Sequence, residues 1–422
     1  MSSVLGRLDE TETIIADTED YPDKHANAIE MEAYPELFAS LMDKASTRRD
    51  LHECGEKNII DRCWRCKADW AENRQSLTEC VTGFAKGTTG GAGGEIYTVT
   101  SCADDNAENP TPGTLRYGVT QNKPLWIIFE KDMLITLKHT LVVSSDKTID
   151  GRGAKVEIAH GGGITIHGVK NVIVHGINIH DVKEMPGFGS RSGCDGDAIG
   201  VKSSSKVWID HCTLSNGPDG LVDVTVGSTG VTISNCKFHH HDKAILLGAD
   251  DAHKEDKNMH VTVAFNRFEG VGQRMPRCRF GFFQVVNNDI RGWGIYAIGG
   301  SSNPTILSQG NRFHAPNEAH LKQVTVRANA KEEEWKKWNW RSEKDLFENG
   351  AFFVPSGSDP QLTQEQQQHM IEVAPGSDVP HLTKCAGKIS SAFSSATNLR
   401  KIGHCNMDPI ERNIIAKGLH VE

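Results

Sequence analysis

The 422-residue chain predicts an all-β fold, a parallel β-helix with loop insertions and short flanking helices. Two observations support this fold class. Short segments rich in β-branched residues recur through the middle of the chain, and the spacing between them approaches a constant value. Glycine is abundant at 41 residues, and helix-forming residues do not dominate the middle of the chain.

Six segments carry the repeat, and Gly, Asn or Ser interrupts them. They span residues 171–180, 206–215, 230–239, 260–269, 282–290 and 304–313. Their last apolar residues are Ile179, Leu214, Phe238, Phe268, Ile290 and Phe313. The intervals between these positions are 35, 24, 30, 22 and 23 residues, a unit of about 22 residues with variable insertions. Such a unit is typical of a solenoid.

The pattern inside each unit is that of a strand, which favours a parallel β-helix over an array of helices. One coil cannot bury its own apolar face, whereas stacked coils bury it jointly and align Ile, Val and Phe into ladders. Asn266 and Asn288 occupy equivalent places and predict an Asn ladder at a sharp bend. We expect residues 125–135 and 148–158 to form the first coils, with the insertions on the binding face.

The composition changes on both sides of this repeat. It predicts an N-terminal extension over residues 1–57, a β-helix domain over 58–358 and a C-terminal tail over 359–422. The extension is highly charged, and we expect it to be partly helical, as over residues 26–43, or disordered. A helix is expected to start within residues 361–368, and the tail beyond Pro375 has no clear periodicity.

Charge and hydropathy limit the binding partners. The formal net charge is -9, so neither nucleic acid nor an anionic membrane is an expected partner. An anionic polysaccharide would need a local basic cleft or a bridging cation. Hydrophobic residues make up 37% of the chain and no stretch approaches the length of a membrane span. Residues 1–20 are polar and acidic and lack the basic and apolar regions of a secretory signal.

Cysteine spacing offers little support for zinc. The chain has 11 cysteines, and Cys63 and Cys66 have CxxC spacing, but no second CxxC follows. Structural thiols or disulfides are therefore the preferred interpretation over a zinc site. The odd number leaves at least one cysteine unpaired if the protein is oxidised.

Two short motifs bring carboxylates together. Residues 194–199 read CDGDAI and residues 218–224 read PDGLVDV, and these motifs supply Asp195, Asp197, Asp219 and Asp223. Asp195 and Asp197 would share a face if they lie on a strand. The motifs are about one coil apart, so they can lie on adjacent coils, and converging carboxylates favour Ca²⁺. The alternative is that each is a turn aspartate, because Asp-Gly is a frequent turn pair.

A basic cluster follows one to three coils later. Residues 273–279 read QRMPRCR and place Arg274, Arg277 and Arg279 within seven positions, in an expected loop or tight bend, while Lys243 follows another strand. These side chains would suit sugar carboxylates, although a solvated surface is the alternative. The histidines at 239–241 cannot all bind one ion from one strand, because successive side chains face opposite sides.

Longer motifs resemble a known family. They are NIIDRCWRCKADWAENR (58–74), WIDHC (208–212), DGLVDVTVGSTGVTISNC (219–236), QRMPRCR (273–279) and YAIGGSSNPTILSQGNRF (296–313). Together they resemble the plant pectate lyases of polysaccharide lyase family 1, with the closest likeness to the pollen allergens of ragweed and mugwort. The resemblance spans about residues 58–358 and implies a single-stranded right-handed parallel β-helix, Ca²⁺ and a secreted enzyme acting on pectin.

The resemblance also implies roles for individual residues. It implies that Asp195, Asp197, Asp219 and Asp223 are calcium ligands. Arg274 resembles the catalytic base, and Lys243 and Arg279 resemble the groups that bind substrate carboxylates. Because arginine is normally protonated up to a pH of about 12, a base role for this residue type predicts activity that favours alkaline pH.

The resulting hypothesis is a monomeric pectate lyase that cleaves de-esterified (1→4)-α-D-galacturonan by β-elimination. Trp208, Asp210 and His211 form the family's WiDH signature and are interpreted as support for the cleft rather than as chemistry. Two alternatives remain. One is a catalytically silent pectate-binding protein with the same fold. The other is a polygalacturonase-type hydrolase, which would need an acid and a base carboxylate on either side of the scissile bond.

Overall fold

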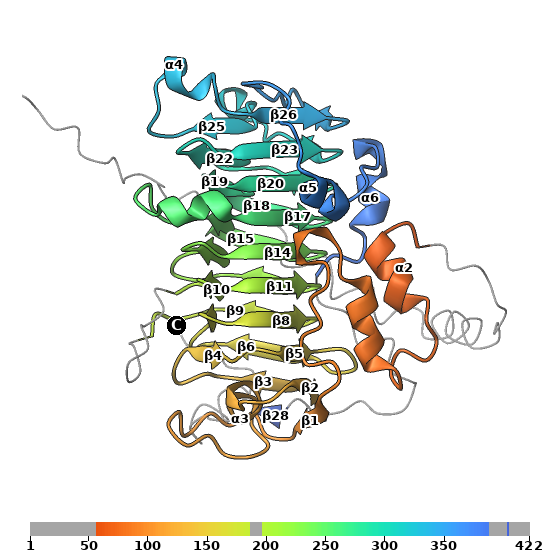
Figure 1. Ribbon diagram of the computed structural model, residues 1–422. Helices are drawn as coiled ribbons and strands as arrows, with labels where there is room; N and C mark the ends of the chain where they lie inside the picture. The colour runs from red at the N-terminus through yellow and green to blue at the C-terminus, as the bar shows by residue number, and fades with distance from the viewer. Residues whose placement is uncertain (1–55, 186–195, 388–402, 405–422) are drawn as a thin grey trace, which may run out of the picture. The chain divides into compact units, whose positions relative to one another are not determined.

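The structure is a computed structural model that describes residues 56–185, 196–387 and 403–404. The expected helix over 26–43, and with it the N-terminal extension up to residue 55, lies outside the described residues. Within them, every sheet is parallel and the strands stack into a right-handed parallel β-helix (Figure 1). Figure 1 shows the coils in succession, from β1 at one end to β26 at the other. The predicted fold class is confirmed.

Three sheets form the walls of the described β-helix. Sheet 1 contains, in order, β1 (Glu95–Val99), β2 (Leu125–Phe129), β5 (Lys147–Asp150), β8 (Lys170–His175), β11 (Ser205–Asp210), β14 (Thr229–Ser234), β17 (His260–Ala264), β20 (Phe282–Val286), β23 (Thr305–Gln309) and β26 (Trp340–Glu343). Sheet 2 contains β4 (Leu141–Val143), β7 (Ile164–His167), β10 (Ile199–Lys202), β13 (Val222–Thr225), β16 (Ile245–Leu247), β19 (Arg277–Arg279), β22 (Ile298–Ser301) and β25 (Thr325–Arg327). Sheet 3 contains β28 (Gly403–His404), β3 (Met133–Ile135), β6 (Val156–Ala159), β9 (Asn178–His180), β12 (Thr213–Ser215), β15 (Lys237–Lys243), β18 (Arg267–Gln273), β21 (Asp289–Arg291), β24 (Arg312–His314) and β27 (Leu346–Glu348).

The apolar ladder expected from the repeat is present with the predicted register. In sheet 3 the partners run in the order Ile179, Leu214, Phe238, Phe268, Ile290 and Phe313. All six side chains are fully buried, and the rings of Phe238 and Phe268 stack with centroids 4.8 Å apart. Each coil therefore places one apolar side chain on the next, which a single coil could not bury alone.

The predicted Asn ladder lies at the bend between sheets 1 and 3. Asn266 Nδ2 donates to Asn288 Oδ1 over 3.0 Å, and Asn288 Nδ2 donates to Asn311 Oδ1 over 2.9 Å. The left-handed backbone belongs to the residue before each ladder position, with φ of 58° at Phe265 and 52° at Asn287. The left-handed turn and the amide ladder therefore fall on two successive residues of the bend.

Helices are short and lie outside the coils. The α-helices are α2 (Ile59–Arg65), α3 (Leu115–Thr120), α4 (Glu332–Trp335), α5 (Gln364–His369) and α6 (Val379–Leu382). The 3₁₀ helices are η1 (Arg74–Cys80), η2 (Gly83–Ala85), η3 (Lys254–Asn258), η4 (Ala319–Leu321) and η5 (Gly376–Asp378). Among the residues described, no helix has the length and apolar character needed to cross a membrane.

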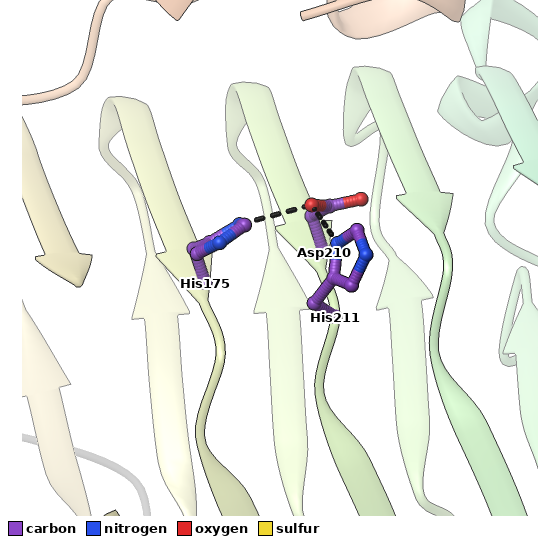
Figure 2. Close-up of side chains that lie close together, drawn as sticks. All are labelled: His175, Asp210 and His211. Carbon is purple, nitrogen blue, oxygen red and sulfur yellow. Dashed lines mark hydrogen bonds and ion pairs between the residues drawn. The ribbon is translucent and has the colours of Figure 1, made fainter. Parts of the chain in front are cut away.

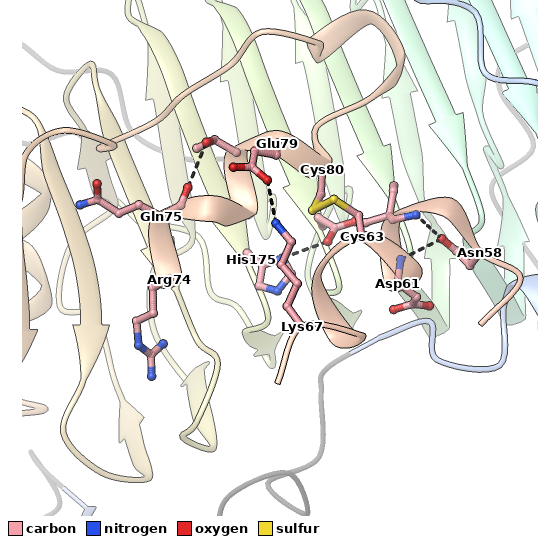
Figure 3. The surroundings of a disulfide bond; sticks show 12 residues. Asn58, Asp61, Cys63, Lys67, Arg74, Gln75, Glu79, Cys80 and His175 are labelled. Atoms are coloured by element: carbon pink, nitrogen blue, oxygen red, sulfur yellow. Dashed lines mark hydrogen bonds and ion pairs between the residues drawn. A yellow bond between two sulfur atoms is a disulfide. The ribbon is translucent and has the colours of Figure 1, made fainter. Parts of the chain in front are cut away.

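The segment before the coils covers sheet 1. Asn58 caps α2 by accepting from the backbone N–H groups of Ile60 and Asp61. A disulfide joins Cys63 in α2 to Cys80 at the end of η1 (Figure 3). This bond confirms the preference for disulfides over zinc at this part of the chain.

A buried chain of polar side chains fixes α2 to the coils. His211 Nε2 lies 2.9 Å from Asp61 Oδ1, and its Nδ1 lies 2.5 Å from Asp210 Oδ2. Figure 2 shows that His175, from the preceding coil, reaches the same carboxylate, with 2.9 Å between His175 Nδ1 and Asp210 Oδ2. Trp208 Nε1 donates to Ser234 Oγ below this chain. The interpretation of the WiDH residues as support for the cleft is therefore wrong, because they lie on sheet 1 beneath α2.

The described part of the tail runs along sheet 1. Gln284 Nε2 donates to the Ile371 carbonyl, and Asn287 Nδ2 donates to the Ala374 carbonyl. The helix expected within 361–368 is α5, which Thr363 caps through a reciprocal pair of bonds with Gln366. Farther along, β28 pairs with β3 and extends sheet 3 by one strand.

Candidate active site

Sheet 2 holds the two clusters that the sequence singled out. One column of paired residues runs across it through Gly200, Asp223, Leu246, Arg277 and Gly299. Neighbouring strands are about 4.8 Å apart, so Asp223 and Arg277 lie roughly 10 Å apart at Cα. The alternating burial of β13 and β19 turns both side chains away from the core. The acidic and the basic clusters therefore share one outer face.

The acidic motifs meet on adjacent coils, as predicted. A Cβ at Gly220 would lie 2.5 Å from Asp223 Oδ1 and 2.9 Å from Asp197 Oδ1. Two carboxylates thus point at the same glycine, and the Gly220 N–H donates to Asp197 Oδ1 over 2.9 Å. Asp195 lies outside the described residues. Asp197 precedes β10 and is not on a strand, so the argument that placed it by strand alternation is wrong.

The glycines of the two Asp-Gly pairs explain why these loops pack so closely. Gly196 has φ of 112°, which an L side chain rarely adopts. A Cβ there would lie 2.0 Å from Pro218 Cγ. The two loops can therefore touch only because residue 196 has no side chain, and this contact brings the carboxylates of Asp197 and Asp223 together.

The donor set fits a hard cation. Asp197 and Asp223 offer carboxylate oxygens around the space that a side chain at Gly220 would fill, and Ca²⁺ prefers several such oxygens in flexible geometry. Asp219 lies in the same loop as Gly220, and its carboxylate forms an ion pair with Lys243. Among the described residues, the groups with three ligand atoms mutually within 4.8 Å lie elsewhere: His175, Asp210 and His211, and Glu56, Asp61 and Cys385. The first group forms the buried chain beneath α2.

Lys243 stands between the acidic and basic clusters. Its Nζ lies 3.4 Å from Asp219 Oδ1, and its backbone pairs with Gln273 on the next coil. His241 Nε2 contacts the Asp219 carbonyl, which ties the acidic loop to β15. Of the three histidines at 239–241, the rings of His239 and His240 contact each other. The expected alternation of successive side chains is therefore wrong at this pair, because His240 has a left-handed φ of 47°.

Arg279 is held in place by a network that the sequence analysis missed. Arg279 Nε donates to Asp251 Oδ1 over 3.1 Å, and Arg279 Nη1 donates to the Gly248 carbonyl over 2.7 Å. Ser301 Oγ donates to the same Asp251 oxygen. Arg279 lies in β19 and not in a loop, so that expectation was wrong. No short motif around Asp251 marks it as a partner of an arginine 28 positions away.

Arg274 stands at the corner between sheets 3 and 2. It follows the last residue of β18 and has φ of 63°, a left-handed conformation that is uncommon for arginine. Its carbonyl accepts from Ile245 N over 2.7 Å, so the backbone of the preceding coil holds this corner. The side chain is half-buried, and its Nε has no hydrogen-bond partner among the described residues.

Tyr296 is a second residue that sequence reasoning did not select. It is 6% exposed and belongs to the YAIGG motif before β22. Burial raises the pKa of its phenol, while the nearby Arg277 and Arg274 oppose that rise. Burial also lowers the pKa of Arg277, and Arg279 and Arg274 lower it further. The basic cluster is thus a mutually repelling set that is partly withdrawn from water.

A large hollow of the described molecule lies away from these clusters. A hollow of about 850 Å³ is lined by residues of η1 and its approach, among them Lys67, Asp69 and Arg74. It adjoins the disulfide segment shown in Figure 3, and none of the predicted site residues is among those that line it. We prefer the outer face of sheet 2 as the candidate active site, because the acidic and basic clusters meet there, although it is not the hollow described above.

Comparison with known proteins identifies the family of the chain. A family model described as pectate lyase matches residues 70–334. Pectate lyase 4 of Ambrosia artemisiifolia is 60% identical over 354 residues, covering 82% of this chain and 89% of that protein. A pectate lyase of Lilium longiflorum is 48% identical over 405 residues, covering 89% and 93%.

Solved structures agree with the fold. The crystal structure of Jun a 1, the major allergen from cedar pollen, is 48% identical with a TM-score of 0.77, covering 79% of this chain and 100% of that one. A pectate lyase bound to a hexasaccharide is 19% identical with a TM-score of 0.55, covering 73% and 96%, and it supports the fold alone. The resemblance seen in the motifs is therefore confirmed, and the chain belongs to the pectate lyase family.

Proposed function

We propose that the protein is a calcium-dependent pectate lyase that cuts (1→4)-α-D-galacturonan by β-elimination. The products would carry 4-deoxy-galact-4-enuronosyl ends. The observation that carries this proposal is the column in sheet 2, which puts Asp223 and Arg277 on one outer face, two strands apart. A polyanion could bind there although the chain as a whole has a net charge of -9.

Asp195, Asp197, Asp219 and Asp223 would hold the calcium ion. When bound, the ion supplies Lewis-acid stabilisation of negative charge on a sugar carboxylate. Lys243 and Arg279 would hold the substrate through its carboxylates, and the bonds to Asp251 and Gly248 orient Arg279 for this task.

Arg274 would remove the proton on C5 of the galacturonate. That carbon is next to the carboxylate, so the negative charge that develops spreads onto oxygens that Lys243 and Arg279 face. The C4–oxygen bond to the next sugar then breaks, a C4–C5 double bond forms, and the leaving oxygen takes up a proton equivalent to the one that Arg274 removed. No net water is consumed.

The hydrolase alternative is less well supported. Hydrolysis needs two carboxylates on either side of the scissile bond, about 5–10 Å apart. Here Asp197 and Asp223 converge on one glycine, and arginines stand on the other side.

The test is ultraviolet absorbance of polygalacturonate mixed with the purified protein, first with calcium and then with EDTA. A rise that needs calcium identifies unsaturated uronide and supports a lyase. Saturated products that form without calcium would support a hydrolase. Retained binding of pectate with no product would support the silent protein.

We further infer that the enzyme acts outside the cell on wall pectin and works as a monomer. Residues 58–358 would form the catalytic domain, and the tail from 359 would brace sheet 1. Size-exclusion chromatography with light scattering would test the monomer, and fractionation of the source tissue would test the location.

A further inference from the structure

Arg277 lies in the column of sheet 2 between two residues without polar side chains. It pairs with Leu246 on one side and with Gly299 on the other. Leu246 is 8% exposed, and Gly299 has no side chain. Neither neighbour in the column can therefore satisfy a guanidinium group that faces away from the core.

Asp251, the carboxylate whose charge affects Arg277, is already bonded to other side chains. Asp251 accepts from Arg279 Nε and from Ser301 Oγ, both over 3.1 Å. Arg277 Nε is buried, and no described residue accepts a hydrogen bond from it. Arg277 and Arg279 lie on the same face of β19, and Asp251 forms its ion pair with Arg279, while no described residue forms an ion pair with Arg277.

Tyr296 brings a further polar group to the same place. A Cβ at Gly299 would lie 2.3 Å from Tyr296 Cε2 and 2.7 Å from Tyr296 Cζ, so the ring lies directly over Gly299. Gly299 is the strand partner of Arg277, and the phenol is thus beside the guanidinium group. The Tyr296 hydroxyl is buried, and the Arg274 side chain lies within hydrogen-bonding reach of it.

Two buried guanidinium nitrogens, Arg274 Nε and Arg277 Nε, consequently lie here without an acceptor in the described part of the chain. These nitrogens can only donate, whereas the phenol of Tyr296 can accept one hydrogen bond and still has a proton to donate. Buried donors are nearly always paired in folded proteins, so an acceptor with negative charge is the group that would complete this set.

We propose that Arg277 and Tyr296 form a second carboxylate-binding subsite beside Arg274. It takes a galacturonate carboxylate adjacent to the one held by Lys243 and Arg279. This inference rests on the proposed function, because it states how the same face selects its substrate. A methyl ester carries no charge, so this subsite favours de-esterified chain over esterified chain.

The experiment compares Arg277→Gln and Tyr296→Phe with wild type. Arg62→Gln is the matched control, because Arg62 is an exposed arginine on α2. KM and kcat are measured on polygalacturonate and on partly methyl-esterified pectin, and calorimetry measures the affinity for trigalacturonate. We expect Arg277→Gln to raise KM for polygalacturonate about tenfold or more, with kcat changed much less. Tyr296→Phe, which keeps the ring over Gly299, should raise KM by a smaller factor.

The preference for de-esterified substrate should shrink in both variants and not in the control. Equal losses on the two substrates, or a fall in kcat at constant KM, would overturn the proposal. The affinity for trigalacturonate distinguishes a failure of the subsite proposal from a failure of the lyase proposal. If the wild type binds the trimer but cleaves nothing, the lyase proposal fails. The subsite is then tested separately, by comparing the trigalacturonate affinity of the variants with that of the wild type. Unchanged affinity in folded Arg277→Gln would refute the subsite.

Discussion

Asp223 and Arg277 occupy the same column of sheet 2, two strands apart, with Leu246 between them. The parallel register fixes this relationship, because each coil repeats the backbone of the one before it at about 4.8 Å. An acidic loop on one coil and an arginine-rich strand two coils later must therefore face the same side.

Arg274→Lys tests the role of the arginine at the corner. Lysine keeps the positive charge but loses the planar group, so a pure binding role would tolerate it better than a proton-transfer role. We expect kcat to fall by roughly 10²–10⁴-fold, the usual contribution of a general base, with trigalacturonate affinity changed far less. Steady-state ultraviolet assays give kcat, and calorimetry gives the affinity. Near-full activity in Arg274→Lys would show that another group takes the proton.

Asp223→Asn tests the calcium site. The substitution keeps the shape of the side chain at the Gly220 contact but removes one negative charge from the donor set. Calcium affinity depends on the number of charged ligands, so the calcium concentration for half-maximal activity should rise roughly tenfold or more. Calcium titration of activity and of the thermal midpoint measures this.

The exposed Asp359, whose side chain is 83% accessible, provides the control Asp359→Asn. Its calcium titration should overlay that of the wild type. A normal calcium requirement in Asp223→Asn would remove Asp223 from the set of ligands. EDTA should abolish wild-type activity, and added calcium should restore it.

The repeat made most of the fold predictable. The positions of Ile179, Leu214 and Phe238 in the sequence were enough to give the register of sheet 3, because an apolar ladder tolerates no one-residue slip. The adjacency of the two acidic motifs followed from the same periodicity. What the spacing could not give was the loop conformation of Asp197, because strand alternation does not extend beyond the strand.

Contacts between distant segments were beyond the reach of the sequence. His211 and Asp61 are 150 positions apart, and no periodicity relates the helix α2 to the coils. Arg279 and Asp251 are likewise joined across an insertion. Tyr296 becomes informative only once its ring is seen over Gly299, since a tyrosine in an apolar motif is by itself a core residue. Such pairings depend on loop paths, which the repeat leaves open.

Asn288→Ala tests the ladder at the bend. Asn288 Oδ1 accepts from Asn266 N over 2.9 Å, and Asn288 Nδ2 donates to the Val263 carbonyl over 2.8 Å. Truncation leaves these buried groups without partners, so we expect a loss of about 2–4 kcal/mol in the free energy of unfolding. Denaturant titration followed by circular dichroism measures it. The exposed Asn317→Ala should cost far less, and an equal loss in both variants would contradict a stabilising ladder.

The buried chain beneath α2 predicts how stability changes with pH. Burial alone would lower the pKa of His211, but Asp210 and Asp61 outweigh it and raise the pKa to about 9. An unfolded histidine titrates near 6.5, so this stabilisation is fully present below about pH 6.5 and is lost as pH rises through about 9. The thermal midpoint of the wild type should therefore fall over that interval.

His211→Gln separates this effect from other titrations. The variant should be less stable at every pH, because it leaves Asp61 and Asp210 buried without their cation. Its thermal midpoint should nevertheless vary less between pH 6.5 and 9 than that of the wild type. Equal slopes would show that another group controls the alkaline limit. If the thermal midpoint of the wild type falls more steeply with pH than that of His211→Gln, the attachment of α2 weakens in the alkaline range. A lyase that favours alkaline pH for catalysis would work in that same range. Catalysis and the stability of α2 would then together set the upper pH limit of the enzyme.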